Sequence, residues 1–373
     1  MKIMHIASFQ GNCGCILSHL GFYNLLKKIL PNENIDVTQI EMRDFYRNSQ
    51  LRKFDNTFLN EVNTYDLLVI GGGSFFDVQY DTQSGATMDM GFDFINGVKI
   101  PVWINSIGYH ELTENEELYN KFYNWISYIK TKPNWFISLR NDGSEQRFNK
   151  RFNVNDYFLT VPDNAFWYER KSPEKIGNDK NKRIGLILTN DLFSSGYNHI
   201  DKDEVNMIFR QIINELLNKN YDITFFLHTP QDFFLLPDLC KEISNENLRK
   251  HVVVSPYISS IKNSISRIEP YYNECDLIVS MRFHGCVLGL LNSIPVIALA
   301  GHKQIEDFMN VNGLADDCVI INNSLSSEKL LKKVQLMLEH SNEIVEKQNC
   351  IIDQMQSSGL KVIETIIDEV KKL

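Results

Sequence analysis

The fold is constrained most by an alternation of short apolar runs with segments of helical periodicity. Apolar runs of about four to eight residues bounded by turn residues are typical of buried strands, whereas apolar residues three and four apart indicate helices. In the first half of the chain, this pattern predicts strands at residues 2–9, 35–41, 65–70, 100–106, 135–139 and 158–161. Helical spacing at residues 16–30 and 115–129 lies between these strands. Such alternation predicts a doubly wound parallel sheet.

A polar segment, residues 171–182, then interrupts the pattern and is typical of an exposed linker. Beyond it, strands are expected at residues 183–189, 223–228, 252–255, 275–280, 294–299 and 317–321. Helices are expected at residues 203–218, 239–248 and 265–273, and the pattern from residue 326 onward is helical throughout.

We therefore expect two Rossmann-like α/β domains whose parallel sheets face a cleft, closed by C-terminal helices. The expected boundaries are an N-terminal domain over 1–170, a linker over 171–182, a C-terminal domain over 183–341, and helices over 342–373 that pack back on the N-terminal domain. This arrangement resembles the general plan of GT-B enzymes. In open parallel sheets, ligands bind outside the carboxyl ends of the strands.

Composition narrows the classes of function. A net charge of -9 argues against a nucleic-acid partner, which usually requires a basic surface. The chain begins without a signal-peptide apolar core and has no apolar run of membrane-spanning length, and its seven cysteines are scattered. These features predict a cytoplasmic protein with free thiols, and they leave peripheral contact with the inner face of the membrane open. No oligomeric state follows from the sequence.

The strongest functional signal follows the expected strand at 275–280, where Arg282 and His284 stand at its carboxyl end, just before an apolar helix. Cationic and titratable side chains directly after a buried strand favour an anionic ligand. The alternative is a core histidine, with the arginine paired to a nearby carboxylate.

Glycine-rich turns follow two strands of the N-terminal half. Gly72, Gly73 and Ser74 follow the strand at 65–70, where glycine permits close approach of the backbone to a ligand. The alternative is a tight turn over the sheet edge. Asn12 stands at the start of the first helix, whose N-terminus attracts anions. Neighbouring Cys13 and Cys15 are expected only to pack.

Three further residues lie at expected strand ends. Arg140 offers a planar fork for a carboxylate or phosphate, unless it forms a surface ion pair. Asp163 follows Pro162 and is a candidate for substrate binding, with an Asx turn or helix cap as the alternative role. Lys303 begins a helix, where its charge opposes the helix dipole and so suggests a nearby anion. The sequence lacks HxxxH and GxSxG patterns, and it has no DxD between apolar runs of the type that holds a nucleotide-bound metal, so we expect no metal site and no serine hydrolase chemistry.

Together these motifs resemble the polysaccharide pyruvyl transferase family over nearly the whole chain. The matching segments are Gly11-Asn12-Cys13-Gly14, residues 66–74 with their three glycines, Ser106-Ile107-Gly108, residues 138–142, Val161-Pro162-Asp163, residues 280–285 and His302-Lys303. The chain departs from the family pattern at Tyr109-His110, which replace a proline, and at Asn141, Phe283 and Gly285.

The resemblance implies transfer of pyruvate from phosphoenolpyruvate to a sugar of a cell-surface polysaccharide or its precursor, with formation of a ketal. It implies no cofactor, phosphoenolpyruvate as the donor substrate, and a sugar acceptor that is free, lipid-linked or nucleotide-linked. His284 would be the general acid and base. Arg282 and Arg140 would hold phosphoenolpyruvate with help from Lys303, and Asn12, Gly72, Gly73 and Ser74 would face the sugar.

The sequence alone is also compatible with three other functions. The main alternative is a GT-B glycosyltransferase with a nucleotide-sugar donor. A nucleotide-sugar epimerase of related fold and a non-catalytic sugar-binding protein are two more.

Overall fold

The computed structural model describes residues 1–46, 51–169, 181–190, 201–260 and 265–373. Most of the expected linker over 171–182 lies outside these residues. The chain forms two compact units. Unit 1 comprises Met1–Phe9, Ser18–Tyr168 and Met355–Leu373, and unit 2 comprises Gln10–Leu17 and Glu169–Gln354. Residues 10–17, which we expected in the N-terminal domain, therefore group with unit 2.

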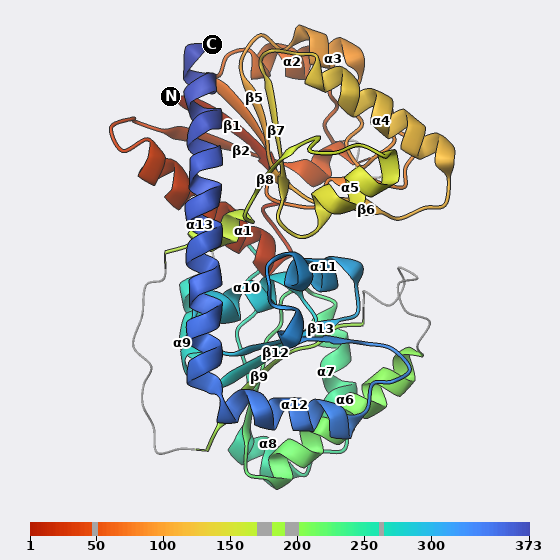
Figure 1. Ribbon diagram of the computed structural model, residues 1–373, viewed down its shortest axis with the longest axis vertical. Coiled ribbons are helices and arrows are strands. Elements are labelled where there is room, and N and C mark those ends of the chain that lie inside the picture. Colours follow the sequence, from red (N-terminus) through yellow and green to blue (C-terminus); the bar gives the residue numbers. More distant parts are fainter. Residues whose placement is uncertain (47–50, 170–180, 191–200, 261–264) are drawn as a thin grey trace. The chain divides into compact units, whose positions relative to one another are not determined.

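Unit 1 is built on a six-stranded parallel sheet with the strand order β2-β1-β3-β5-β7-β8 (Figure 1). The strands are β1 (Lys2–Ala7), β2 (Asp36–Glu41), β3 (Leu67–Gly71), β5 (Val102–Ile107), β7 (Trp135–Arg140) and β8 (Leu159–Val161). Every residue of β3 and β5 is buried, because helices cover both faces of the sheet. The expected doubly wound sheet is confirmed. A small parallel pair, β4 (Phe76–Val78) and β6 (Tyr109–Glu111), was not expected.

Two sets of helices cover this sheet. The buried side chains of α2 (Asn56–Val62), α3 (Phe92–Gly97), α4 (Glu116–Lys130) and α5 (Ser144–Phe152) share one core with alternate strand residues such as Met4 and Ile6. On the other face, Phe22 of α1 (Cys13–Ile29) and Ile363 of α13 (Ser341–Lys372) pack with Ile3. The short 3-10 helices are η1 (Met42–Phe45) and η2 (Asn164–Trp167).

Unit 2 repeats this plan with the strand order β11-β10-β9-β12-β13-β14, again all parallel. The strands are β9 (Arg183–Ile187), β10 (Asp222–Phe225), β11 (Val252–Val254), β12 (Leu277–Ser280), β13 (Val296–Ala300) and β14 (Cys318–Ile320). In this sheet β9 lies between β10 and β12, so the segments that follow these three strands end at one edge.

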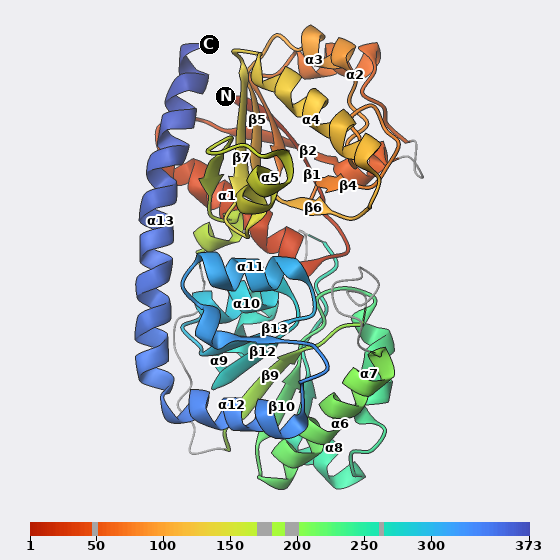
Figure 2. The same ribbon diagram turned by 45° about the vertical axis from the view of Figure 1, so that its right-hand side comes forward.

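Helices cover both faces of this second sheet (Figure 2). The helices α6 (Lys202–Asn218), α7 (Asp232–Cys240) and α12 (Ser327–Glu339) share a core with Val279 and Ile297. Gly289 of α10 (Phe283–Leu291) packs on Ile278 and Val296. These two residues alternate along their strands with Val279 and Ile297, so they face the opposite side of the sheet. The remaining helices are α8 (Asn245–His251), α9 (Glu269–Asn273), α11 (Lys303–Val311), η4 (Ile265–Arg267) and η5 (Ala315–Asp317).

The helices of the C-terminal half differ in part from the expected ones. A single helix was expected over 239–248, but α7 ends at Cys240 and α8 begins at Asn245. The reason is local, because Ser244 is extended and its side chain accepts a hydrogen bond from Asn247 N, which caps a new helix. The tail forms one 32-residue helix, α13, and the division between the two units falls within it.

Candidate active site

The carboxyl ends of β9, β10 and β12 in unit 2 are joined by the side chain of Arg282. Its Nη2 donates to Thr189 Oγ1 at 2.9 Å and to Thr229 Oγ1 at 2.7 Å. Its Nε donates to Asp232 Oδ2 at 3.1 Å. Arg282 is the N-cap of α10, and its backbone N–H donates to Ser280 Oγ at 3.1 Å. Arg282 therefore fixes the relative positions of three strand ends.

Asp232 is the buried carboxylate that neutralises Arg282. Only 2% of Asp232 is exposed, and its Oδ2 also accepts the backbone N–H groups of His228 at 2.8 Å and Thr229 at 2.9 Å. We expected Arg282 to hold an anionic substrate. The structure places its guanidinium in an ion pair with Asp232, as in the alternative that the sequence left open.

His284 lies in the first turn of α10, two residues beyond the cap, and is partly buried. Its imidazole fills the space beside Gly14, where an added Cβ would overlap the ring and lie 2.6 Å from His284 Cβ. Phe283 packs edge-on against the same imidazole, with 4.9 Å between ring centroids. The two contacts fix the ring at the carboxyl edge of the sheet.

The segment that carries Gly14 is held to unit 2 by backbone hydrogen bonds. Gly11 N donates to Ser259 O at 2.8 Å, and Cys13 N donates to His228 O at 2.9 Å. Asn12 Oδ1 accepts Gly14 N at 2.8 Å and so caps α1. Asn12 therefore belongs with His284 in unit 2, whereas Gly72, Gly73 and Ser74 lie in unit 1.

Sequence reasoning gave little weight to His228, which follows β10 and is 1% exposed. Its Nε2 lies 3.1 Å from Tyr272 Oη. Burial lowers the pKa of His228 to about 3, and the positive charge of Arg282 acts in the same direction. The ring is therefore neutral at physiological pH. The sequence feature that could have indicated His228 is the same one that indicated His284, namely a histidine directly after a buried apolar run.

Lys303 begins α11, as expected, and its neighbours explain how the charge is tolerated there. Its Nζ lies 3.0 Å from Glu306 Oε2 and 3.3 Å from Asp307 Oδ1, one turn further along the helix. The preceding His302 caps the helix, because its Nδ1 accepts Gln304 N at 3.2 Å. Two carboxylates on its own helix thus offset the unfavourable helix dipole.

In unit 1, the structure brings Arg140, Asp163 and Ser74 together. Arg140 is 2% exposed, and its Nη1 donates to Asp163 Oδ2 at 3.2 Å while its Nη2 donates to Ser74 Oγ at 3.1 Å. Its Nε donates to Asp142 Oδ2 at 2.8 Å. Burial raises the pKa of Asp142, but the guanidinium groups of Arg140 and Arg147 outweigh it, and the pKa falls to about 2. Arg140, expected to hold an anion, is thus enclosed by two carboxylates of unit 1.

The glycines before Ser74 pack closely against side chains of unit 1. Gly72 has φ of +78°, and a Cβ there would lie 3.0 Å from the ring of His19. A Cβ at Gly73 would lie 3.0 Å from the ring of Phe75. Asp163 Oδ1 accepts Ala165 N at 2.8 Å and caps η2, which was the alternative role for this residue.

The cysteine thiols are free, and burial raises the pKa of Cys13 to about 12. Within the described ranges, no three His, Cys, Asp or Glu side chains are arranged to hold a metal ion. No helix in the described part of the chain is long and apolar enough to cross a membrane.

Each unit is a parallel sheet with helices on both faces and polar side chains at the strand ends, which defines a Rossmann-like fold of the GT-B type. Three solved structures share this fold. Anabaena Alr3699/HepE in complex with UDP is 13% identical, has a TM-score of 0.57 and covers 99% of this chain and 100% of its own. The UDP-GlcNAc 2-epimerase from Methanocaldococcus jannaschii is 13% identical, with a TM-score of 0.54 and coverage of 91% and 93%. S. aureus MnaA with UDP is 8% identical, with a TM-score of 0.51 and coverage of 93% and 90%.

The chain belongs to the polysaccharide pyruvyl transferase family, whose model matches residues 12–303. It is therefore a transferase enzyme. No match was found among curated proteins. The matched range contains Asn12, Gly72, Arg140, Arg282 and Lys303, and thus segments of both units.

Proposed function

We propose that this enzyme transfers pyruvate from phosphoenolpyruvate to two hydroxyl groups of one sugar and forms a ketal. The observation that carries the proposal is the placement of His284, which the backbone of Gly14 and the ring of Phe283 hold at the carboxyl edge of a parallel sheet. Histidine is suited to both donate and accept a proton near neutral pH. The family match over residues 12–303 supports the same reaction class.

The reaction balances without an oxidant or a further reactant. A proton is added to the methylene carbon of phosphoenolpyruvate, one sugar hydroxyl forms a C–O bond to the adjacent carbon, and that hydroxyl loses its proton. The bond between this carbon and the phosphate oxygen then breaks, and a second hydroxyl closes the ketal. The two sugar hydroxyls release one proton each. One of these protons balances the proton added to the methylene carbon, and the other leaves with the phosphate.

In this scheme His284 donates the proton to the methylene carbon and accepts one from the attacking hydroxyl. The N-terminus of α10 and the ammonium group of Lys303 favour the negative charges of the donor. Arg282 is engaged by Asp232 inside unit 2, and Arg140 by Asp142 and Asp163 inside unit 1. We assign both arginines to positioning, because binding of an anion by either would compete with buried carboxylates.

The acceptor in this proposal is a sugar of a cell-surface polysaccharide or of its precursor. We place Gly72, Gly73 and Ser74 on the acceptor side, since they follow the carboxyl end of β3 in unit 1. The donor substrate is a metabolite of the cytoplasm, where we place the enzyme. A lipid-linked acceptor would bring it to the inner face of the membrane.

A GT-B glycosyltransferase that uses a nucleotide sugar is the second candidate, because two of the solved structures with this fold are complexes with UDP. The test offers the purified protein phosphoenolpyruvate or UDP-sugars, each with the same panel of acceptors. Phosphate release with the mass gain of one pyruvyl ketal supports pyruvyl transfer. Release of UDP with the mass gain of a sugar, and no reaction with phosphoenolpyruvate, would overturn it.

A further inference from the structure

We propose that Phe233, Phe234 and Tyr257 form a stacking platform for sugar rings of a carbohydrate chain bound next to the His284 site. We call these three residues the aromatic platform. The inference rests on the proposed function, because it concerns the acceptor. It adds that the enzyme holds an extended saccharide and not only the sugar that reacts.

The exposure of the two phenylalanine rings is the first observation. Phe234 is 84% exposed and Phe233 is 46% exposed, although both stand in the first turn of α7, whose next residue, Leu235, is 3% exposed. The Phe233 ring packs edge-on against Tyr257, with 5.5 Å between centroids. Two adjacent exposed phenylalanines expose apolar area to water without a contribution to the core, and this is typical of a binding surface.

The aromatic platform and the residues around His284 both lie within unit 2. Phe233 directly follows Asp232, the carboxylate that binds Arg282. Tyr257 Oη donates to Gly11 O at 3.1 Å, in the same turn that places Gly14 against His284. Phe233 and Phe234 follow the carboxyl end of β10, and Tyr257 follows that of β11, so they lie at the same edge of the sheet as His284, which follows β12.

The chemistry of this surface favours a saccharide over an anionic membrane. The face of an aromatic ring carries negative charge density and attracts the polarised C–H groups that line one side of a sugar ring. The stretch from Pro230 to Cys240 contains no lysine or arginine, and its charged residues are Asp232 and Asp238. Binding to an anionic lipid surface usually requires basic residues beside the apolar ones.

The experiment measures binding of saccharides without any donor. Calorimetry would follow the binding of glucose, maltohexaose, cellohexaose and mannohexaose to the wild type and to Phe233→Ala, Phe234→Ala and the double variant. We expect at least one hexasaccharide to bind, with the double variant binding it about tenfold more weakly. Phe234→Trp should retain binding because it retains an aromatic face, and glucose should bind all variants equally.

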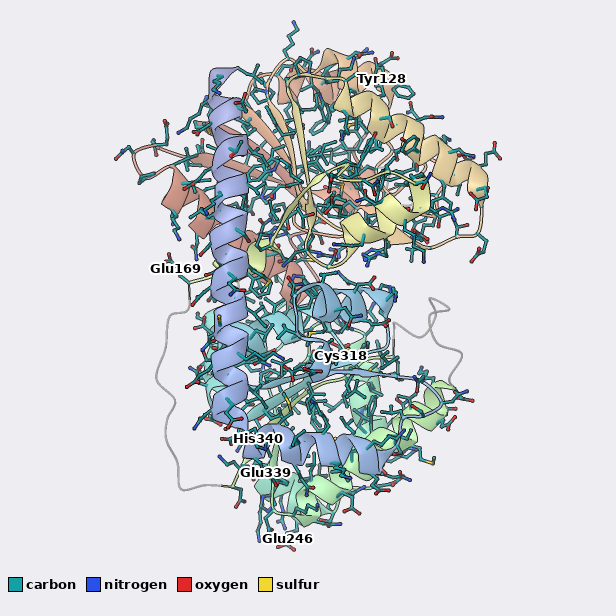
Figure 3. The ribbon with its side chains drawn as sticks, in the orientation of Figure 1. Tyr128, Glu169, Glu246, Cys318, Glu339 and His340 are labelled. Atoms are coloured by element: carbon teal, nitrogen blue, oxygen red, sulfur yellow. The ribbon has the colours of Figure 1, made fainter. Side chains whose placement is uncertain are left out.

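Phe92→Ala provides the matched control. Phe92 of α3 in unit 1 is 44% exposed and packs edge-on against Tyr128, with 4.7 Å between ring centroids. Tyr128 is labelled on α4 in Figure 3. This variant also removes one exposed phenylalanine ring, at a position that is far in the sequence from residues 230–257. It should bind the hexasaccharide like the wild type, and its unfolding midpoint shows what loss of such a ring costs in stability.

Three results would overturn the proposal. They are the absence of hexasaccharide binding by the wild type, equal binding by the double variant, and loss of binding to phosphatidylglycerol vesicles in the double variant while saccharide binding is unchanged. Failure of the proposed function looks different. In that case hexasaccharides bind through the aromatic platform, but the wild type releases no phosphate from phosphoenolpyruvate.

Discussion

The imidazole of His284 occupies the space that a side chain at residue 14 would require, so these two positions, 270 residues apart in the chain, constrain each other. Gly14 lies in the first turn of α1, and His284 lies in the first turn of α10. The starts of two helices thus meet at the histidine within unit 2. Residue 14 is therefore restricted to glycine, because a Cβ there would overlap the imidazole.

The first prediction follows from this contact. Gly14→Ala should displace the His284 ring and lower transfer activity about 10²-fold, since displacements of about 1 Å cost this much. Overpacking should also lower the free energy of unfolding by about 1–3 kcal/mol. The measurements are steady-state kinetics and urea unfolding. The double variant Gly14→Ala/His284→Ala has room for the new methyl group, so it should regain stability without regaining activity. Full activity in Gly14→Ala would contradict the contact.

The second prediction concerns the ion pair of Arg282 and Asp232. Asp232→Ala leaves a buried guanidinium without its carboxylate, and loss of one partner of such a pair costs about 3–5 kcal/mol in unfolding free energy. The control is Asp238→Ala on the same helix, whose carboxylate pairs with Arg210 at 2.8 Å and is 36% exposed. Because the Asp238 carboxylate is in contact with water and Arg210 keeps Glu242 at 3.1 Å, its loss should cost only about 0–1 kcal/mol. Urea unfolding that gives equal losses for the two variants would argue against a structural ion pair at Arg282.

The third prediction concerns pH and His228. Its pKa is lowered from the usual 6.5 to about 3, so the folded protein takes up this proton less readily than the unfolded chain. The resulting stability is present above pH 6.5 and is lost as pH falls toward 3. In an NMR titration of labelled histidines, the signal that disappears in His228→Asn should not shift between pH 5 and 8. A midpoint near pH 6.5 for this signal would show that the ring is solvated.

The fourth prediction concerns acid stability and Asp142. Its pKa is lowered from 3.8 to about 2, so the stability that it contributes is present above about pH 4 and is lost as pH falls toward 2. Asp142→Asn should therefore be less stable than the wild type at pH 7, and the difference should shrink below pH 4. Thermal unfolding followed from pH 7 to pH 2 tests this. If the difference in stability between Asp142→Asn and the wild type stayed constant from pH 7 to pH 2, the ionised carboxylate of Asp142 could not be its source.

Most of the fold was predictable from the sequence, because buried parallel strands are continuous apolar runs. All six strands of each sheet were predicted within a few residues of their observed positions. The pair β4 and β6 was missed, since each has three residues and neither gives a periodic signal. The single helix expected over 239–248 was wrong, because Ser244 caps a second helix at a point where apolar spacing continues.

The candidate site was predictable only in part. The motifs correctly placed Arg282 and His284 after a buried strand, because strand ends can be read from local sequence. The pairing of Arg282 with Asp232 could not be read in this way, since 50 residues separate them and only the order of the strands brings them together. The same holds for Asn12, which the chain order assigns to the first domain and the fold assigns to unit 2.

The most direct test of the catalytic role of His284 compares phosphate release from phosphoenolpyruvate by the wild type and by His284→Ala, in the presence of a sugar acceptor. His284 is partly exposed at the start of a helix, so loss of its contacts with Gly14 and Phe283 should lower the urea midpoint only slightly. We predict acceptor-dependent phosphate release by the wild type, and a rate about 10²–10⁴-fold lower in the variant, as expected for loss of a general acid and base. A stable His284→Ala protein with a near-normal rate would show that His284 is not the general acid and base.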